Sequence, residues 1–144
     1  MAGLNHDFLL LSTRECQYTD YMKWINNDRA ILIHDDIMNY MYDTLKWITC
    51  YYPARKMMKH KGLNFYGPTV IKKDGAVEAQ KVFATWATLF SAGPKRIKLT
   101  GEGADHSGIR INRDEVVKNL RTLARYSKSV ANSDGSLFLL HLGI

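Results

Sequence analysis

The chain has 144 residues, of which 46% are hydrophobic and 24% charged, and it carries a net charge of +6. This composition excludes an intrinsically disordered chain, which would hold fewer apolar residues, and the length predicts one domain over residues 1–144. No apolar run approaches the roughly 20 residues of a membrane-spanning helix, and the N-terminus lacks the basic start of a secretory signal. We therefore expect a cytoplasmic protein with no membrane partner.

The positive charge is concentrated in the middle of the chain. Residues 1–50 contain four Lys and Arg against seven Asp and Glu, whereas residues 51–100 contain ten against two, and residues 101–144 contain six against five. A basic segment can attract nucleic acid, so its position matters more than the total charge. The distribution predicts an acidic first third and a basic middle.

The two cysteines, Cys16 and Cys50, have a spacing that matches no metal or redox motif. Free, partly buried thiols in a reducing compartment are the simpler interpretation, and one disulfide is the alternative. The chain also has no glycine-rich phosphate loop and no HExxH, paired CxxC or GxSxG motif. We therefore expect neither a cofactor nor a bound metal.

The first half of the chain predicts two strands and two helices. The apolar run 8–11 indicates a buried strand, and apolar residues at helical spacing predict a helix over about 14–25. The run AILI is a second apolar strand. A long helix is then expected over 37–52, with Asp35 or Asp36 as its N-cap.

A basic, aromatic connector, residues 51–67, leads into the second half of the chain. The extended segment that follows it ends in a turn predicted at Asp74–Gly75. An amphipathic stripe then predicts a helix that Gly93–Pro94 ends, because glycine accepts a left-handed cap and proline cannot continue a helix.

Two strands joined by a loop come next, and then a helix and a strand complete the chain. Asn112 with Glu115 three residues later is typical of a helix start, and the apolar run 137–142 predicts a strand in the centre of a sheet. The order β-α-β-α-β-α-β-β-α-β predicts a single α/β or α+β domain, with a mixed β-sheet of about five to six strands flanked by about four helices.

Two basic features suggest nucleic-acid binding as an alternative function. The connector combines cations that can hold phosphates with rings that can stack on bases, although a solvated link is the simpler interpretation. In the last helix, four cations lie within an arc of about 80° opposite an apolar stripe, which is typical of a phosphate-contacting helix and equally of a surface helix. The residues that would contact nucleic acid are Arg55, Lys56, Lys59, Lys61, Lys118, Arg121, Arg125 and Lys128.

An enzyme is the second alternative. The loop between the two short strands supplies Glu102, Asp105 and His106, whose carboxylates and imidazole can perform acid–base chemistry or bind a metal. A polar hairpin loop needs such residues for its turn in any case. A catalytic site would therefore have to be assembled from distant residues, such as His34 or His141, around this loop.

Aromatic residues are concentrated in the acidic first third. Six of eight Tyr and two of three Trp lie in residues 1–52, and such rings dominate both cores and interface hot spots. We expect a small non-enzymatic protein of the inhibitor, immunity or adaptor type, which covers a site on another protein of basic character; the oligomeric state stays open. The residues expected at the interface are Asp35, Asp36, Tyr40, Tyr42, Asp43, Trp47 and Tyr51.

Overall fold

A computed structural model describes residues 4–100 and 110–144. They contain a six-stranded sheet in the order β2-β1-β8-β5-β3-β4, and the five ladders that join neighbouring strands are all antiparallel. With four α-helices in the same residues, the expected strand and helix counts are confirmed, in the α+β form. The strands are β1 (Asn5–Ser12), β2 (Ile31–His34), β3 (Thr49–Tyr52), β4 (Met58–Lys61), β5 (Pro68–Ile71) and β8 (Leu137–Leu142).

The last strand, β8, lies in the middle of the sheet. Leu140 is paired with Leu9 of β1 on one side and with Val70 of β5 on the other. Every residue from Phe138 to Leu142 is buried, as expected for a strand that is covered on both faces. The predicted central position is therefore confirmed.

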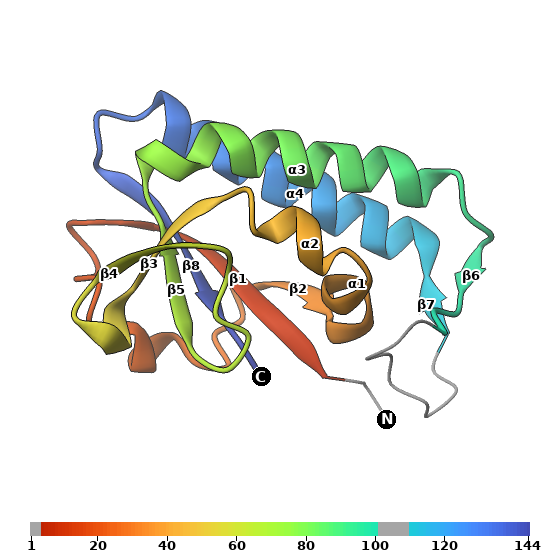
Figure 1. The fold of residues 1–144 in the computed structure, drawn as a ribbon, viewed down its shortest axis with the longest axis horizontal. Coiled ribbons are helices and arrows are strands. Elements are labelled where there is room, and N and C mark those ends of the chain that lie inside the picture. Colours follow the sequence, from red (N-terminus) through yellow and green to blue (C-terminus); the bar gives the residue numbers. More distant parts are fainter. Residues whose placement is uncertain (1–3, 101–109) are drawn as a thin grey trace.

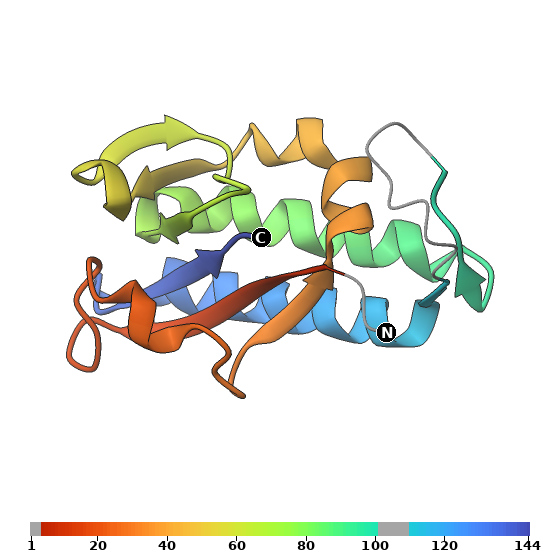
Figure 2. The same ribbon diagram turned by 90° about the horizontal axis from the view of Figure 1, so that it is seen from below.

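Two long helices, α3 (Lys73–Ser91) and α4 (Arg113–Asn132), lie side by side across one face of the sheet (Figures 1 and 2). Trp86 of α3 and Leu120 of α4 are almost completely buried in the core on this side of the sheet, and burying one such side chain contributes roughly 1.5–3 kcal/mol. The Asn112 side chain accepts the backbone N–H of Glu115 at 3.0 Å, so the predicted start of the last helix is confirmed.

The opposite face of the sheet is covered by residues 13–30, where a helix was expected. This segment contains a 3-10 turn, η1 (Tyr21–Trp24), between irregular turns. Tyr18 packs edge-on against Phe138 of β8 with ring centroids 4.9 Å apart. Met22 is 70% exposed, so the apolar residues at helical spacing do not share one buried side. Packing against the sheet outweighs the weak helical preference of this segment.

The prediction of one long helix over residues 37–52 is also wrong. The chain forms two short helices, α1 (Asp35–Tyr40) and α2 (Tyr42–Leu45), and then enters β3. The N-cap is His34, whose Nδ1 accepts the N–H of Asp36 at 3.0 Å, in place of either aspartate. The sequence TCYY carries β-branched and aromatic residues that favour a strand.

The basic connector is part of the sheet. After a short turn, η2 (Pro53–Arg55), the chain forms β4 and pairs with β3, and all four residues of β4 are exposed. Lysines on an edge strand discourage pairing with the strands of other molecules. A second, two-stranded ribbon of β6 (Arg96–Ile97) and β7 (Ile111–Asn112) joins the ends of α3 and α4.

The two cysteines lie on opposite faces of the sheet. Cys50 is buried beneath the long helices and Cys16 in the core under residues 13–30, so the sheet separates two free thiols. Burial raises the pKa of Cys50 to about 12, which keeps this thiol protonated and unreactive. Within the described residues, none of the helices has the length and apolarity needed to cross a bilayer.

Gly75, expected in a turn, is inside the first turn of α3. A Cβ atom at this position would lie 2.1 Å from the backbone oxygen of Thr49 in β3. The glycine therefore allows the helix to cross the strand in close contact, and it does not form the predicted turn.

We expect Gly75→Ala to lower the free energy of unfolding by about 1–3 kcal/mol, because the helix must move away from β3. Alanine normally stabilises an exposed helical position relative to glycine by up to about 1 kcal/mol, so the sign of the change is informative. Urea denaturation of Gly75→Ala and of Val77→Ala, an exposed position of the same helix, measures it. An unchanged or raised stability in Gly75→Ala contradicts the close crossing.

Candidate functional site

The segment α1–α2 exposes three large rings within eight residues. Tyr40 is 58%, Tyr42 44% and Trp47 62% exposed. The segment is nevertheless firmly seated, because its other side buries Ile37, Met38 and Leu45 in the core, where they are at most 1% exposed. Exposed aromatic side chains on a fixed backbone are typical of surfaces that bind other proteins. We call this surface the α1–α2 face.

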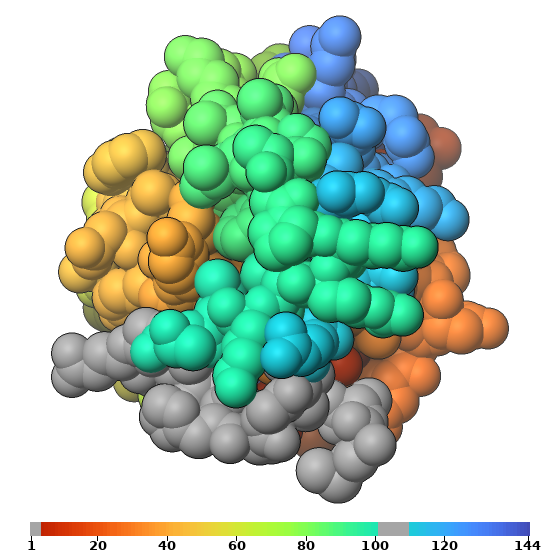
Figure 3. Space-filling model, turned by 90° about the vertical axis from the view of Figure 1, so that its right-hand side faces the viewer, coloured from red at the N-terminus to blue at the C-terminus, as the bar shows by residue number. Residues whose placement is uncertain are grey.

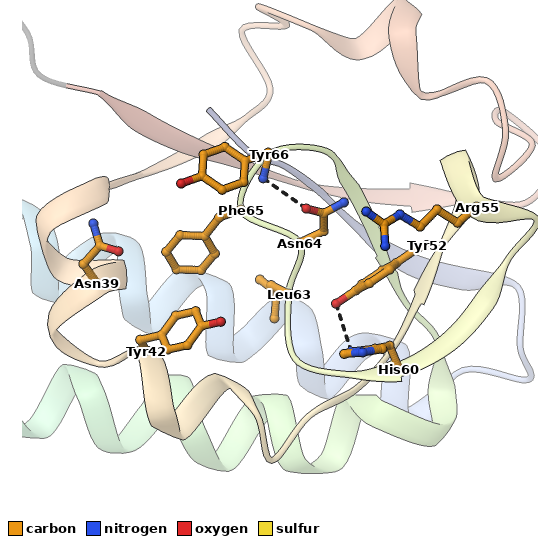
Figure 4. A pocket seen from close by; sticks show the side chains of 9 residues that line it. All are labelled: Asn39, Tyr42, Tyr52, Arg55, His60, Leu63, Asn64, Phe65 and Tyr66. Atoms are coloured by element: carbon orange, nitrogen blue, oxygen red, sulfur yellow. Dashed lines mark hydrogen bonds between the residues drawn. The ribbon is translucent and has the colours of Figure 1, made fainter. Parts of the chain in front are cut away.

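A hollow of about 620 Å³ lies on one side of the α1–α2 face. Figure 4 shows Tyr42, Phe65 and Tyr66 at one end of it and Tyr52, Arg55 and His60 at the other. The rings of Tyr42 and Phe65 meet edge-on with centroids 5.2 Å apart. Most of the lining comes from the connector, whose residues therefore shape a concave surface.

The polar end of this hollow is organised by Tyr52. Its hydroxyl donates to the carbonyl oxygen of Gly62 at 2.8 Å and lies 3.1 Å from Nδ1 of His60. The His60 ring stacks on the Tyr52 ring with centroids 5.0 Å apart, and burial raises the pKa of Tyr52. The guanidinium of Arg55 forms no ion pair with any described residue, so it is free to donate hydrogen bonds to a partner's carboxylate.

A second hollow, of about 360 Å³, lies on the other side of the face, between α2 and α3. Met41 and Trp47 line it from the α1–α2 segment, and Val82 and Trp86 line it from α3. The indole N–H of Trp86 donates to Thr44 Oγ1 at 2.8 Å and ties the two helices together. Tyr42 lines the first hollow and Trp47 the second, so the segment that carries the exposed rings forms a ridge between two concave surfaces.

The α1–α2 face is not acidic, although the first third of the chain is. Asp35 and Asp36 are buried, with 9% and 2% of their surface exposed, so neither is available to a partner. Asp43 is exposed but forms an ion pair with Lys46 at 3.2 Å. The expected attraction of a basic partner therefore has no support in the charges of this face.

Tyr51 is on a different part of the surface from the other expected contact residues. Its ring packs with the core under residues 13–30, and its hydroxyl donates to Asp74 at 2.6 Å, which raises the pKa of Tyr51 to about 12. The ammonium group of Lys72 lies 4.3 Å from the ring centroid. These contacts account for Tyr51 without a partner.

Beneath the α1–α2 face, a buried chain of hydrogen bonds joins four polar side chains. Thr69 Oγ1 is 3.2 Å from His141 Nδ1, His141 Nε2 is 2.8 Å from His6 Nδ1, and His6 Nε2 is 2.7 Å from Asp35 Oδ1. The amide of Asn39 donates to the second oxygen of Asp35 at 2.9 Å. Every donor is satisfied when each member donates toward Asp35, with both histidines neutral and the carboxylate charged.

Burial lowers the pKa of His6, although the neighbouring Asp35 opposes the shift. Burial and the nearby His6 place the pKa of His141 well below its ordinary value. Both imidazoles are completely buried, so they are out of reach of a substrate at the surface. The chain of bonds joins β1, β5, β8 and α1, and its role in this structure is to position α1.

The eight cations expected to contact nucleic acid lie in two places. Arg55, Lys56, Lys59 and Lys61 belong to η2, β4 and the turn between them, at one edge of the sheet. Lys118, Arg121, Arg125 and Lys128 are exposed on α4, which contacts the opposite edge through a hydrogen bond from Asn119 to the carbonyl oxygen of Leu32 in β2. The two sets therefore lie near opposite edges of the sheet.

The proposed catalytic loop residues, Glu102, Asp105 and His106, lie outside the described residues. Sequence reasoning missed the bond between His6 and His141, because 135 positions separate them and neither has a local motif. It also missed that Phe65 and Tyr66 share a hollow with Tyr42. The combination of rings and cations in the connector was the available signal.

Comparison of the chain with protein-family models, with curated protein sequences and with solved structures gave no match.

We expect the free energy of unfolding to fall as the pH drops below about 6.5. The unfolded chain then protonates its histidines, while His6 and His141, with lowered folded-state pKa values, stay neutral in the fold. Each such histidine contributes a slope of at most about 1.4 kcal/mol per pH unit. Urea denaturation at a series of pH values from about 7.5 to about 5.5 measures this slope.

His141→Gln should lower stability throughout and also flatten the slope, because one titrating group is removed. Val77→Ala, at an exposed position of α3 that carries no titrating group, should leave the slope unchanged. An equal slope in the wild type and in His141→Gln would show that His141 titrates normally in the fold.

Proposed function

We propose that the protein acts by binding another protein through the α1–α2 face, as an inhibitor, immunity or adaptor protein does. The observation that carries this proposal is the ridge of Tyr40, Tyr42 and Trp47, exposed between two hollows. A ring that projects from a fixed ridge fills a partner's pocket, and the hollows accept side chains in return.

The rigidity of the face supports this function. α2 is held to α3 by the bond between Trp86 and Thr44, and α1 is held to the sheet through Asp35. A surface that is already ordered loses little conformational entropy on binding. The energy of burying a few rings is therefore available for affinity.

The charges beside the ridge describe the partner. Asp43 pairs with Lys46 at 3.2 Å, and Glu78 pairs with Lys81 at 3.8 Å, so these neighbours largely cancel. Arg55 in the first hollow has no such counterion among the described residues. The partner expected here presents apolar side chains to the ridge and a carboxylate to Arg55, and a strongly basic partner is not required.

The free thiols fit a reducing compartment, so the cytoplasm is the expected place.

Trp47→Ala should weaken partner binding by about 30-fold or more, since a ring at the centre of an interface contributes about 2 kcal/mol or more. Immobilised wild-type protein and variants are incubated with nuclease-treated cell extract, and retained proteins are identified by mass spectrometry. Titration calorimetry on the purified partner then gives the dissociation constants.

Met22→Ala is the matched control, because Met22 is 70% exposed on the opposite face of the sheet. A partner that is kept by the wild type and Met22→Ala but lost by Trp47→Ala supports the proposal. A partner that is retained equally by all three binds elsewhere, and that result refutes the α1–α2 face as the interface.

A further inference from the structure

The outer side of the helix layer carries a basic groove of about 680 Å³. Its four cations are Arg113, Lys118, Arg121 and Arg125 of α4, and Ser91 of α3 lines the facing wall. The apolar residues of α4 point the other way, since Val116, Leu120 and Leu123 are buried in the core. Helical geometry gathers Lys118, Arg121 and Arg125 in one row of about 10 Å, and Arg113 lies off this row at the start of the helix. We call this row with its groove the α4 groove.

Three of these cations are available to a ligand. Lys118, Arg121 and Arg125 form no ion pair with any residue in ranges 4–100 and 110–144. Arg113 is held in place, because it pairs with Asp114 at 3.0 Å and donates to the carbonyl oxygen of Gly93 at 3.2 Å. Arg121 and Arg125 also have no acidic residue at i±3 or i±4, the positions from which a helix neighbour could pair with them, so these two cations favour an external anion.

More cations continue the α4 groove around the end of the molecule. Lys95, Arg96 and Lys98 are exposed along β6, and Arg110 is exposed just before β7. The carbonyl oxygen of Lys95 accepts the N–H of Arg113 at 3.0 Å, so this set begins where the groove begins. Figure 3 faces this end and shows the strand segments packed against the start of α4, with long side chains projecting outward.

We propose that the α4 groove binds the phosphate backbone of double-stranded nucleic acid without reading its sequence. A row of point charges matches a polymer that carries one negative charge per roughly 1.7 Å of duplex. The hydroxyl groups of Ser91 and Thr122, which also line the groove, already donate to the carbonyl oxygens of Thr88 and Lys118, so the cations are the groups that would contact phosphate. Among the described lining residues none is aromatic, so stacking on unpaired bases is not what this groove offers.

A lipid surface is the less suitable polyanion. A helix that binds membranes inserts apolar residues beside its cations. Here the apolar side of α4 is buried in the core, and the groove is concave. Duplex binding also differs from the proposed protein binding in place, because Figure 2 shows α3 between α4 and the α1–α2 segment.

Fluorescence anisotropy with a labelled duplex of about 20 base pairs, titrated with the full chain between about 50 and about 200 mM salt, tests this binding. Three neutralised phosphates predict a slope of log K against log salt of about −2.7, and hence a loss of affinity of roughly 40-fold across this range. The double variant Arg121→Gln/Arg125→Gln should make the slope shallower by about 1.8, because two phosphate contacts are lost. These side chains are exposed, so the fold should be kept, and a thermal melt checks this.

Lys59→Gln/Lys61→Gln on β4 removes the same charge at the other edge of the sheet and should leave the slope unchanged. Equal effects of the two double variants would show that net charge alone causes binding, which overturns the proposal. Absent or salt-insensitive binding also overturns it, as does tighter binding to vesicles rich in anionic lipid than to the duplex. Trp47→Ala should bind the duplex like the wild type. A failure of duplex binding can therefore be told apart from a failure of protein binding at the α1–α2 face.

Discussion

The buried carboxylate of Asp35 is the constraint on which the candidate face depends. An ionised carboxylate without partners in an apolar interior costs several kcal/mol. α1 can therefore begin only where hydrogen-bond donors are in place for the carboxylate of Asp35. His6 on β1 supplies one bond, and His141 on β8 orients His6 in turn. The first turn of α1 is thereby fixed to the centre of the sheet, and the rings of the following turns are directed outward.

The pair of helices α3 and α4 provides the second constraint, because it packs across one face of the sheet (Figures 1 and 2). α3 crosses β3 closely at Gly75, where no Cβ is present, and its Trp86 reaches across to Thr44 of α2. The α1–α2 segment is therefore held to α3 through Thr44 and to the sheet through Asp35. A surface of this kind meets its partner in the conformation that it already has.

Much of the fold could be predicted wherever a hydrophobic pattern was long and its ends were marked by capping or turn residues. α3 and α4 were found because each shows one clear helical period over most of its length, and β8 because it is a continuous apolar run. Residues 14–25 were mistaken for a helix because Tyr18 packs on a sheet that the local sequence does not reveal. The exposure of Tyr40, Tyr42 and Trp47 was part of the prediction, whereas the burial of Asp35 could not be, since its partner His6 is 29 positions away.

The surplus of positive charge has two different physical explanations. On β4 the lysines protect an edge strand, and Lys59 also approaches Asp74 at 3.7 Å, so these charges serve the fold itself. On α4 the apolar residues already secure the helix, and a row of like charges at i, i+3 and i+7 is mildly unfavourable for it. Such a row is not needed for stability. An external anion therefore explains the basic residues on α4 better than it explains those on β4.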